Sequence, residues 1–208
     1  MINSKIQTIR SHFRKTDQII YKTMKDVDFD EWVKPDRPKD GLSYFRHLSR
    51  EIIGQQLSGK AANAIIERFK KLFENGEVDP HQLLTTSDQR LRDAGMSWAK
   101  ASYVKNIAQA YLDDSVKFDK FDQLPDEEII HELTTIKGVG PWTAEMFLIF
   151  TLHRPDVFSF GDLGLKKGFA KLYGIENPTK VQIEEVIVKW KPYTSYGSIT
   201  LWHSLDNR

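Results

Sequence analysis

Apolar residues recur at helical spacing along most of the chain. In residues 43–76, one apolar stripe ends near Ile53 and a second runs from Ala61 to Phe69, with the letters GQQLSG between them. A period of three to four residues is typical of amphipathic helices that turn one face toward a core. The pattern therefore predicts two helices, separated by a polar break between Gly54 and Gly59.

The same period continues through the middle of the chain. Residues 81–114 predict two or three further helices, with Gly95 as a C-terminal cap. The stretch LPDEEIIHELTTIKG predicts a helix with Pro125 in its first turn and its end at Gly138. Strand-like alternation is limited to the short, isolated VFSF at 157–160. We therefore expect an all-α protein.

Composition narrows the chemistry. The 208 residues are 40% hydrophobic and 12% aromatic, which suits a packed core, and no apolar run reaches the roughly 20 residues of a membrane span. The absence of cysteine excludes disulfides, thiolate metal sites and cysteine-ligated clusters. The histidines show no metal-ligand spacing, and the N-terminal residues do not resemble a secretory signal. We expect a cytoplasmic protein without a metal site or a membrane partner.

Charge gives no direct indication of a partner. The 30 basic residues are balanced by 29 acidic ones, for a net charge of +1. Binding to a polyanion would therefore depend on a local patch or on backbone donors.

A glycine-rich turn supplies such donors. In LTTIKGVGPWTAEMFLIF, Gly138, Gly140 and Pro141 separate two helical segments. A turn of this kind leaves backbone N–H groups pointing outward at a helix N-terminus, where an anion such as a phosphate binds, and Lys137 adds a positive charge. The alternative is an ordinary turn between helices, and the turn alone does not decide between them.

Five segments together resemble a known family. They are similar to the helix-hairpin-helix DNA glycosylases, and within them to the 3-methyladenine DNA glycosylase II family. The resemblance covers about residues 40–202. The segments are EIIGQQLSGKAANAI (51–65), AGMSWAKASYVKNIA (94–108), LTTIKGVGPWTAEMFLIF (133–150), RPDVFSFGDLGLKKG (154–168) and WKPYTSYG (190–197).

The resemblance implies hydrolysis of the N-glycosidic bond between a damaged base and deoxyribose. Asp162 matches the catalytic aspartate of the family, whose carboxylate would stabilise positive charge on the sugar or direct a water to it. An aspartate at this position is also a good N-cap for the following helix. The two roles are compatible.

Trp142 bears on the reaction type. Family members that also cut the strand carry a lysine at this point of the hairpin, so tryptophan implies a monofunctional glycosylase. Trp142 and Tyr193 would hold a flipped, cationic alkylated purine by stacking. Met146 stands where some relatives have an aromatic residue. Trp98 is a further candidate for the same pocket, although a place in the core is the better-supported interpretation for this residue.

The resemblance also implies DNA contacts on two loops. The hairpin residues Lys137, Gly138, Val139 and Gly140 would bind the DNA backbone. A second loop would enter the duplex to fill the gap left by the flipped base, and the sequence does not decide which of its side chains is inserted. Its residues are Gln55, Gln56, Leu57 and Ser58. A polar interhelical turn is the alternative for this loop.

The family architecture implies two helical lobes with the active site in the cleft between them. One lobe would combine residues 1–40 and 154–208, and the other would span 41–153, with a linker at 30–41. No cofactor is implied, although the hairpin carbonyls could hold a monovalent cation. The expected partner is double-stranded DNA with damaged bases, bound by a monomer. Thr194 stands where an arginine is common in the family.

Two other functions stay open. One is a non-catalytic hairpin module that binds DNA and senses damage. The other is a glycosylase for deaminated or oxidised bases.

Overall fold

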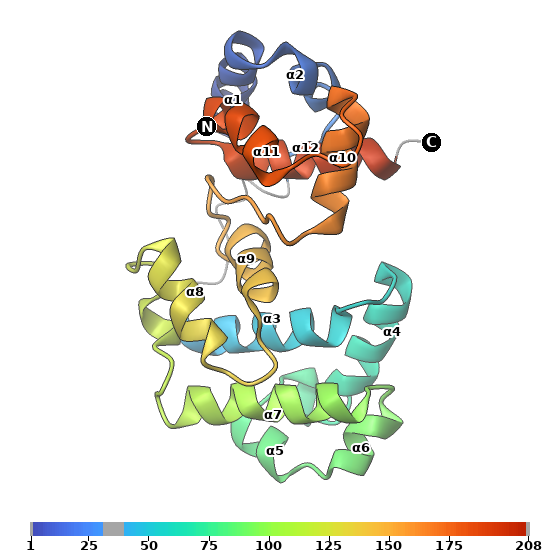
Figure 1. Cartoon of the computed structure of the whole chain (residues 1–208). Helices are drawn as coiled ribbons and strands as arrows, with labels where there is room; N and C mark the ends of the chain where they lie inside the picture. The colour runs from blue at the N-terminus through green and yellow to red at the C-terminus, as the bar shows by residue number, and fades with distance from the viewer. Residues whose placement is uncertain (1, 31–39, 207–208) are drawn as a thin grey trace. The chain divides into compact units, whose positions relative to one another are not determined.

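The computed structural model describes residues 2–30 and 40–206, and within these ranges every regular element is a helix (Figure 1). The all-α prediction is confirmed, and residues 157–160 form no strand. Most of the linker expected at 30–41 lies outside the described residues. The chain divides into two compact units, residues 1–37 with 148–208 and residues 38–147. The boundary between residues 147 and 148 falls inside a helix, and it precedes the boundary expected between residues 153 and 154.

The unit of residues 38–147 is built around a pair of long helices, α3 (Gly41–Gly54) and α7 (Trp98–Leu112), which pack on each other (Figure 1). The predicted break after Gly54 is present, and Gly95 takes a left-handed φ of 108° after α6. The other helices are α4 (Gly59–Lys70), η2 (Glu74–Gly76), α5 (Pro80–Thr85), α6 (Asp88–Asp93), η3 (Phe118–Lys120) and α8 (Asp126–Thr134).

Helix α9 (Pro141–Phe150) begins in this unit and ends in the other. The unit of residues 1–37 and 148–208 contains α10 packed on α12, with α2 against both (Figure 1). Its core includes Phe13, Phe169 and Trp190, all fully buried. Its helices are α1 (Ile2–Thr16), α2 (Gln18–Met24), α10 (Leu163–Tyr173), α11 (Lys180–Ile187), η4 (Val188–Trp190) and α12 (Thr194–Asp206).

A buried carboxylate, Asp17, ties the N-terminal helices to the C-terminal ones within this unit. Its Oδ1 accepts hydrogen bonds from the N–H groups of Ile19 and Ile20 at 3.0 and 3.3 Å, which caps α2. Its Oδ2 accepts from the Tyr173 hydroxyl at 2.6 Å and from Trp190 Nε1 at 2.9 Å. Burial, together with the bond to Asp17, raises the pKa of the Tyr173 phenol, which stays a donor.

Asp17→Ala should therefore lower the free energy of unfolding by about 3 kcal/mol, because it leaves a buried hydroxyl and a buried indole N–H without an acceptor. Thr179→Ala is the matched control, since Thr179 caps α11 at the surface and should cost about 1 kcal/mol. Urea denaturation measures both. Equal losses would show that Asp17 acts only as a cap.

Candidate functional site

The hairpin between α8 and α9 is tighter than the sequence predicted. Helix α8 ends at Thr134 rather than at Gly138. The N–H groups of Thr135, Ile136 and Val139 donate to carbonyls three residues back, at 3.0–3.1 Å, so the chain leaves the α-helix in successive tight turns. The Gly140 carbonyl then accepts from Ala144 N–H at 3.0 Å, which starts α9.

The structural requirement for glycine differs between the two hairpin positions. Gly138 has a φ of 107°, and a Cβ there would lie 2.2 Å from the Tyr103 ring, so both backbone conformation and packing require it. A Cβ on Gly140 would meet nothing within 4 Å. The Val139 side chain is buried, and Lys137 is exposed.

The hairpin presents backbone donors. Within residues 2–30 and 40–206, no group accepts a hydrogen bond from the N–H of Gly138 or Gly140. Asn106 Nδ2 on α7 donates to the Lys137 carbonyl at 2.9 Å and holds the start of the turn. Two N–H groups beside the N-terminus of α9 form an arrangement suited to an anion.

The loop between α3 and α4 is held from two sides. Lys100 Nζ on α7 donates to the carbonyls of Ile53 and Gln55, at 2.8 and 2.7 Å. Gln55 Nε2 donates to Thr143 Oγ1 on α9 at 2.7 Å. Burial lowers the pKa of the Lys100 ammonium. The lysine thus satisfies carbonyls at the C-terminal end of α3, where a positive charge also complements the helix dipole.

The four loop residues have distinct surroundings. Gln55 is anchored, and Ser58 accepts from Ala61 N–H as the N-cap of α4. Gln56 has a positive φ of 59°, which is uncommon for its residue type. Leu57 is 39% exposed and is the one large apolar side chain among these four residues. Leu57 is therefore the side chain best suited to leave the loop and contact another molecule.

The candidate pocket residues of this unit differ in exposure. Trp142 in the first turn of α9 is 39% exposed, whereas Met146, one turn further on, is buried. Trp98 is 57% exposed, so the interpretation of Trp98 as a core residue was wrong. The Arg92 guanidinium lies 5.0 Å from the Trp98 ring centroid and covers part of it. Trp98 begins α7, which places it at the end of the helix rather than on its buried face.

In the other unit, Asp162 is buried and is the N-cap of α10. Its Oδ1 accepts from Leu165 N–H at 2.7 Å and from Trp202 Nε1 on α12 at 3.0 Å. Trp202 in turn packs on Phe150, with ring centroids 5.4 Å apart. A Cβ on Gly164 would lie 2.9 Å from the Trp202 ring, so this glycine lets the indole approach the carboxylate. The cap expected from the sequence is present.

The segment that leads to Asp162 is fastened to the start of α12. Ser195 Oγ donates to the Arg154 carbonyl at 2.6 Å and accepts from Val157 N–H at 2.9 Å. Thr194 donates to Asp156 Oδ1 through both its N–H and its hydroxyl. The position where an arginine is common in the family therefore holds a buried threonine with a structural role in this chain.

Tyr193 is half-buried in the same unit. Its ring meets His12 edge to face at 5.3 Å and Tyr196 at 6.2 Å. His12 Nε2 lies 3.0 Å from the Lys189 carbonyl, which steadies the imidazole. Tyr193 and Trp142 belong to different units, so their joint role in one pocket stays a prediction.

Other types of site find no support in the described part of the chain. No group of three or more His, Asp or Glu side chains there could hold a metal ion. No helix in the same ranges is long and apolar enough to cross a membrane.

Residues 49–192 match the family model of the HhH-GPD superfamily base excision DNA repair proteins. The chain belongs to this superfamily. Among curated HhH-GPD relatives, DNA-3-methyladenine glycosylase 1 of Schizosaccharomyces pombe is 34% identical over 172 residues, which cover 81% of this chain and 75% of the relative. A putative DNA-3-methyladenine glycosylase of Bacillus subtilis is 29% identical over 208 residues. The match covers 97% of this chain and 70% of that relative.

Solved structures of DNA-3-methyladenine glycosylases are similar to this chain. The S. pombe 3-methyladenine DNA glycosylase in complex with abasic DNA has a TM-score of 0.81 and 31% identity, covering 94% of this chain and 95% of that one. A DNA-3-methyladenine glycosidase from Bacillus halodurans has a TM-score of 0.76 and 33% identity, covering 93% and 87%.

Sequence reasoning missed two residues of the candidate site. Trp202 lies 40 positions after Asp162, and nothing in the helical pattern of its segment indicates a bond to that carboxylate. Lys100 lies in the segment AGMSWAKASYVKNIA, but its partners are carbonyls 45 and 47 positions away. The signal available for Lys100 was a lysine in the first turn of a helix, where the dipole disfavours a cation.

Lys100→Met should loosen the loop of residues 55–58, because it keeps the apolar stem but removes both donors to the loop carbonyls. We expect a loss of about 1–3 kcal/mol in unfolding free energy and faster amide exchange in residues 53–58. Lys105→Met on the same helix is the control, since its pair with Asp88 is at the surface and should be worth about 0.5 kcal/mol. Unchanged exchange in Lys100→Met would contradict this role.

Proposed function

We propose that this protein is a monofunctional DNA glycosylase that hydrolyses the N-glycosidic bond of alkylated purines, such as 3-methyladenine and 7-methylguanine, in base excision repair. The observation that carries the proposal is Asp162, a buried carboxylate at the family's catalytic position whose Oδ1 is held by Leu165 N–H and Trp202 Nε1. The relatives named as 3-methyladenine glycosylases support the substrate class.

DNA binding falls to the hairpin and the neighbouring loop. The N–H groups of Gly138 and Gly140 bind a backbone phosphate, and exposed Lys137 adds charge. The open space at Gly140 lets the backbone approach the phosphate closely. Leu57 enters the base stack and takes the place of the damaged base after that base has rotated out. The Lys137 carbonyl and its neighbours are the place where a monovalent cation would bind.

The base is recognised by its charge. Methylation at a purine ring nitrogen makes the base cationic, and an electron-rich ring attracts a cation with about 0.5–2 kcal/mol. Trp142 is exposed enough to offer its face, and Tyr193 is held by His12 and Tyr196 for the same purpose. Recognition by stacking and charge accepts several alkylated purines rather than one.

The chemistry needs one fixed negative charge. As the base leaves with the electron pair of the glycosidic bond, the sugar carbon becomes positively charged. The Asp162 carboxylate stabilises this charge, and a water then bonds to the carbon and releases one proton to the solvent. The products are the free base and an abasic deoxyribose. The bonds from Leu165 and Trp202 keep the carboxylate in one orientation, which is the preorganisation that such stabilisation requires.

The reaction stops at hydrolysis. Strand cleavage by a glycosylase needs an amine that forms a Schiff base with the sugar, and the hairpin position that would carry the lysine is Trp142. Lys137 precedes the hairpin glycines and is not at that position. We therefore expect the DNA strand to stay intact after base release.

Asp162→Asn tests the proposal. Asparagine keeps an oxygen that accepts from Leu165 and Trp202 but removes the charge, so base release from methylated duplex DNA should fall by about 10²–10³-fold. DNA affinity should change by less than about threefold. The same products, analysed before and after alkali, show whether the strand was cut.

Asp79→Asn is the matched control, because Asp79 caps α5 through the Gln82 N–H and should keep full activity. Equal release by wild type and Asp162→Asn would leave Asp162 as a cap only. DNA binding without release by the wild type would identify the protein as a binding module instead.

A further inference from the structure

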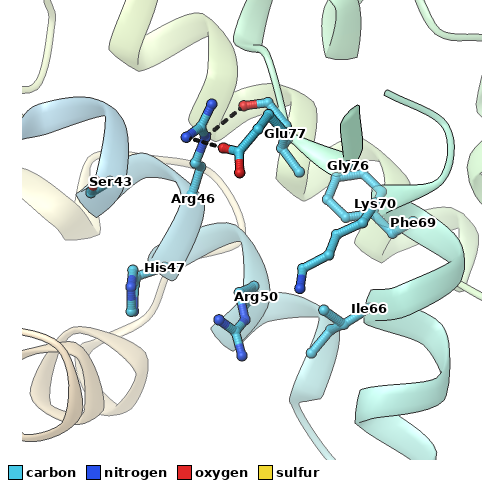
Figure 2. A pocket seen from close by; sticks show the side chains of 10 residues that line it. Ser43, Arg46, His47, Arg50, Ile66, Phe69, Lys70, Gly76 and Glu77 are labelled. Atoms are coloured by element: carbon cyan, nitrogen blue, oxygen red, sulfur yellow. Dashed lines mark hydrogen bonds and ion pairs between the residues drawn. The ribbon is translucent and has the colours of Figure 1, made fainter. Parts of the chain in front are cut away.

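A separate cavity of about 210 Å³ lies between α3, α4 and residues 76–78 (Figure 2). Its α3 wall is formed by Ser43, Arg46, His47 and Arg50. Steps of three and four residues place these side chains on one face of the helix. The opposite face of α3 is buried in the core, so these side chains lie on its polar side.

The cavity has an apolar floor. Ile66, Phe69 and Val78 line it, and all three are buried. The polar part of the lining comes from α3 and from Lys70 on α4. An apolar lining with a few polar groups beside it is typical of sites for small ligands.

Arg46 forms part of the wall. It donates from Nε to the Val78 carbonyl at 2.9 Å and pairs with Glu77. These bonds hold residues 77–78 against α3 and use the arginine for structure. Glu77 also neutralises its charge, so Arg46 adds little to the charge of the cavity.

Arg50 and Lys70 are the cations available to a ligand. Both residues line the cavity, Arg50 from α3 and Lys70 from α4 (Figure 2). Lys70 pairs with Glu67 at 2.9 Å, and because the Glu67 side chain is exposed to solvent, the pair is weak and a ligand can compete for the lysine. Arg50 forms no ion pair within the described residues. The pKa of Glu67 is lowered mainly by Lys70 and further by Arg50 and Lys71, so all three cations lie near this carboxylate, although Lys71 does not line the cavity.

We propose that this cavity is a second anion site, which binds a phosphate group between Arg50 and Lys70. The planar fork of an arginine and the compact charge of a lysine together suit a phosphate. The volume is below the about 300 Å³ of sites for drug-sized ligands, so one sugar phosphate fits better than a dinucleotide.

The site is independent of the proposed glycosylase chemistry, because it shares no residue with the hairpin, the loop or the Asp162 region. Two sources supply its ligand chemistry. One is a free nucleoside monophosphate, and the other is a phosphate of a DNA strand bound to the protein.

Amide chemical shifts of the full chain, recorded by NMR, test the site. Titration with inorganic phosphate and with deoxyadenosine monophosphate should shift amides of residues 43–50 and 66–78. Arg50→Met keeps the stem but removes the charge, and should weaken both titrations by about tenfold or more. Lys71→Met is the control, since it removes the same charge from the position next to Lys70, outside the cavity lining, and should change neither titration by more than about twofold.

The outcomes separate the two sources. Tighter binding of the nucleotide than of phosphate, with unchanged affinity for an undamaged duplex in Arg50→Met, assigns the site to free nucleotides. A loss of duplex affinity in Arg50→Met but not in Lys71→Met assigns it to a DNA strand. Absence of shifts with either small anion and unchanged duplex affinity overturns the proposal, and so do equal losses in Arg50→Met and Lys71→Met. Spectra of the free variants outside the cavity show whether each variant is folded.

Discussion

The interaction on which the proposed chemistry depends is the pair of hydrogen bonds accepted by one oxygen of Asp162. Leu165 N–H comes from the first turn of α10, and the Trp202 indole comes from α12, so two helices fix a single carboxylate. A charge that must stabilise a cationic transition state is effective only if it is held in place before the reaction. The small size of Gly164 and the bonds of Ser195 serve this placement.

In the unit of residues 38–147, the proposed contacts to DNA depend on backbone N–H groups more than on charged side chains. The net charge of +1 gives the chain little general attraction for DNA. The left-handed Gly138, packed on Tyr103, turns the chain so that N–H groups face outward beside α9. Lys100 and Thr143 fix the neighbouring loop from α7 and α9. The hairpin and the loop are thus both held by α7 and α9. This fixes the positions of the two parts of the proposed DNA surface relative to each other.

Much of this was predictable from the sequence, and the reasons for the failures are specific. Helical period gave the all-α class and the break after Gly54, since both follow from local spacing. The end of α8 was placed too late because the turn residues 135–139 continue with tight bonds to carbonyls three residues back, which an apolar pattern does not distinguish from a helix. Trp98 was assigned to the core because residue type alone does not show that a helix end is exposed.

Residues of the candidate site could be predicted only where they belong to a recognisable sequence motif. Asp162 and the hairpin glycines were named from their segments, whereas Trp202 and Lys100 act through partners far away in sequence. Interactions over that separation depend on how helices pack, and a single sequence contains no local signal for them. The cavity beside Arg50 has the same origin, because its walls come from α3, α4 and the residues after η2.

The most direct test of the central claim is the affinity for two duplexes that differ only in the charge of the abasic residue. One carries a cationic pyrrolidine in place of the sugar, and the other carries a neutral tetrahydrofuran. If the Asp162 carboxylate stabilises a positively charged sugar, the wild type should bind the cationic duplex at least about tenfold more tightly, and Asp162→Asn should lose this preference. Equal affinities of the wild type for both duplexes would contradict the account.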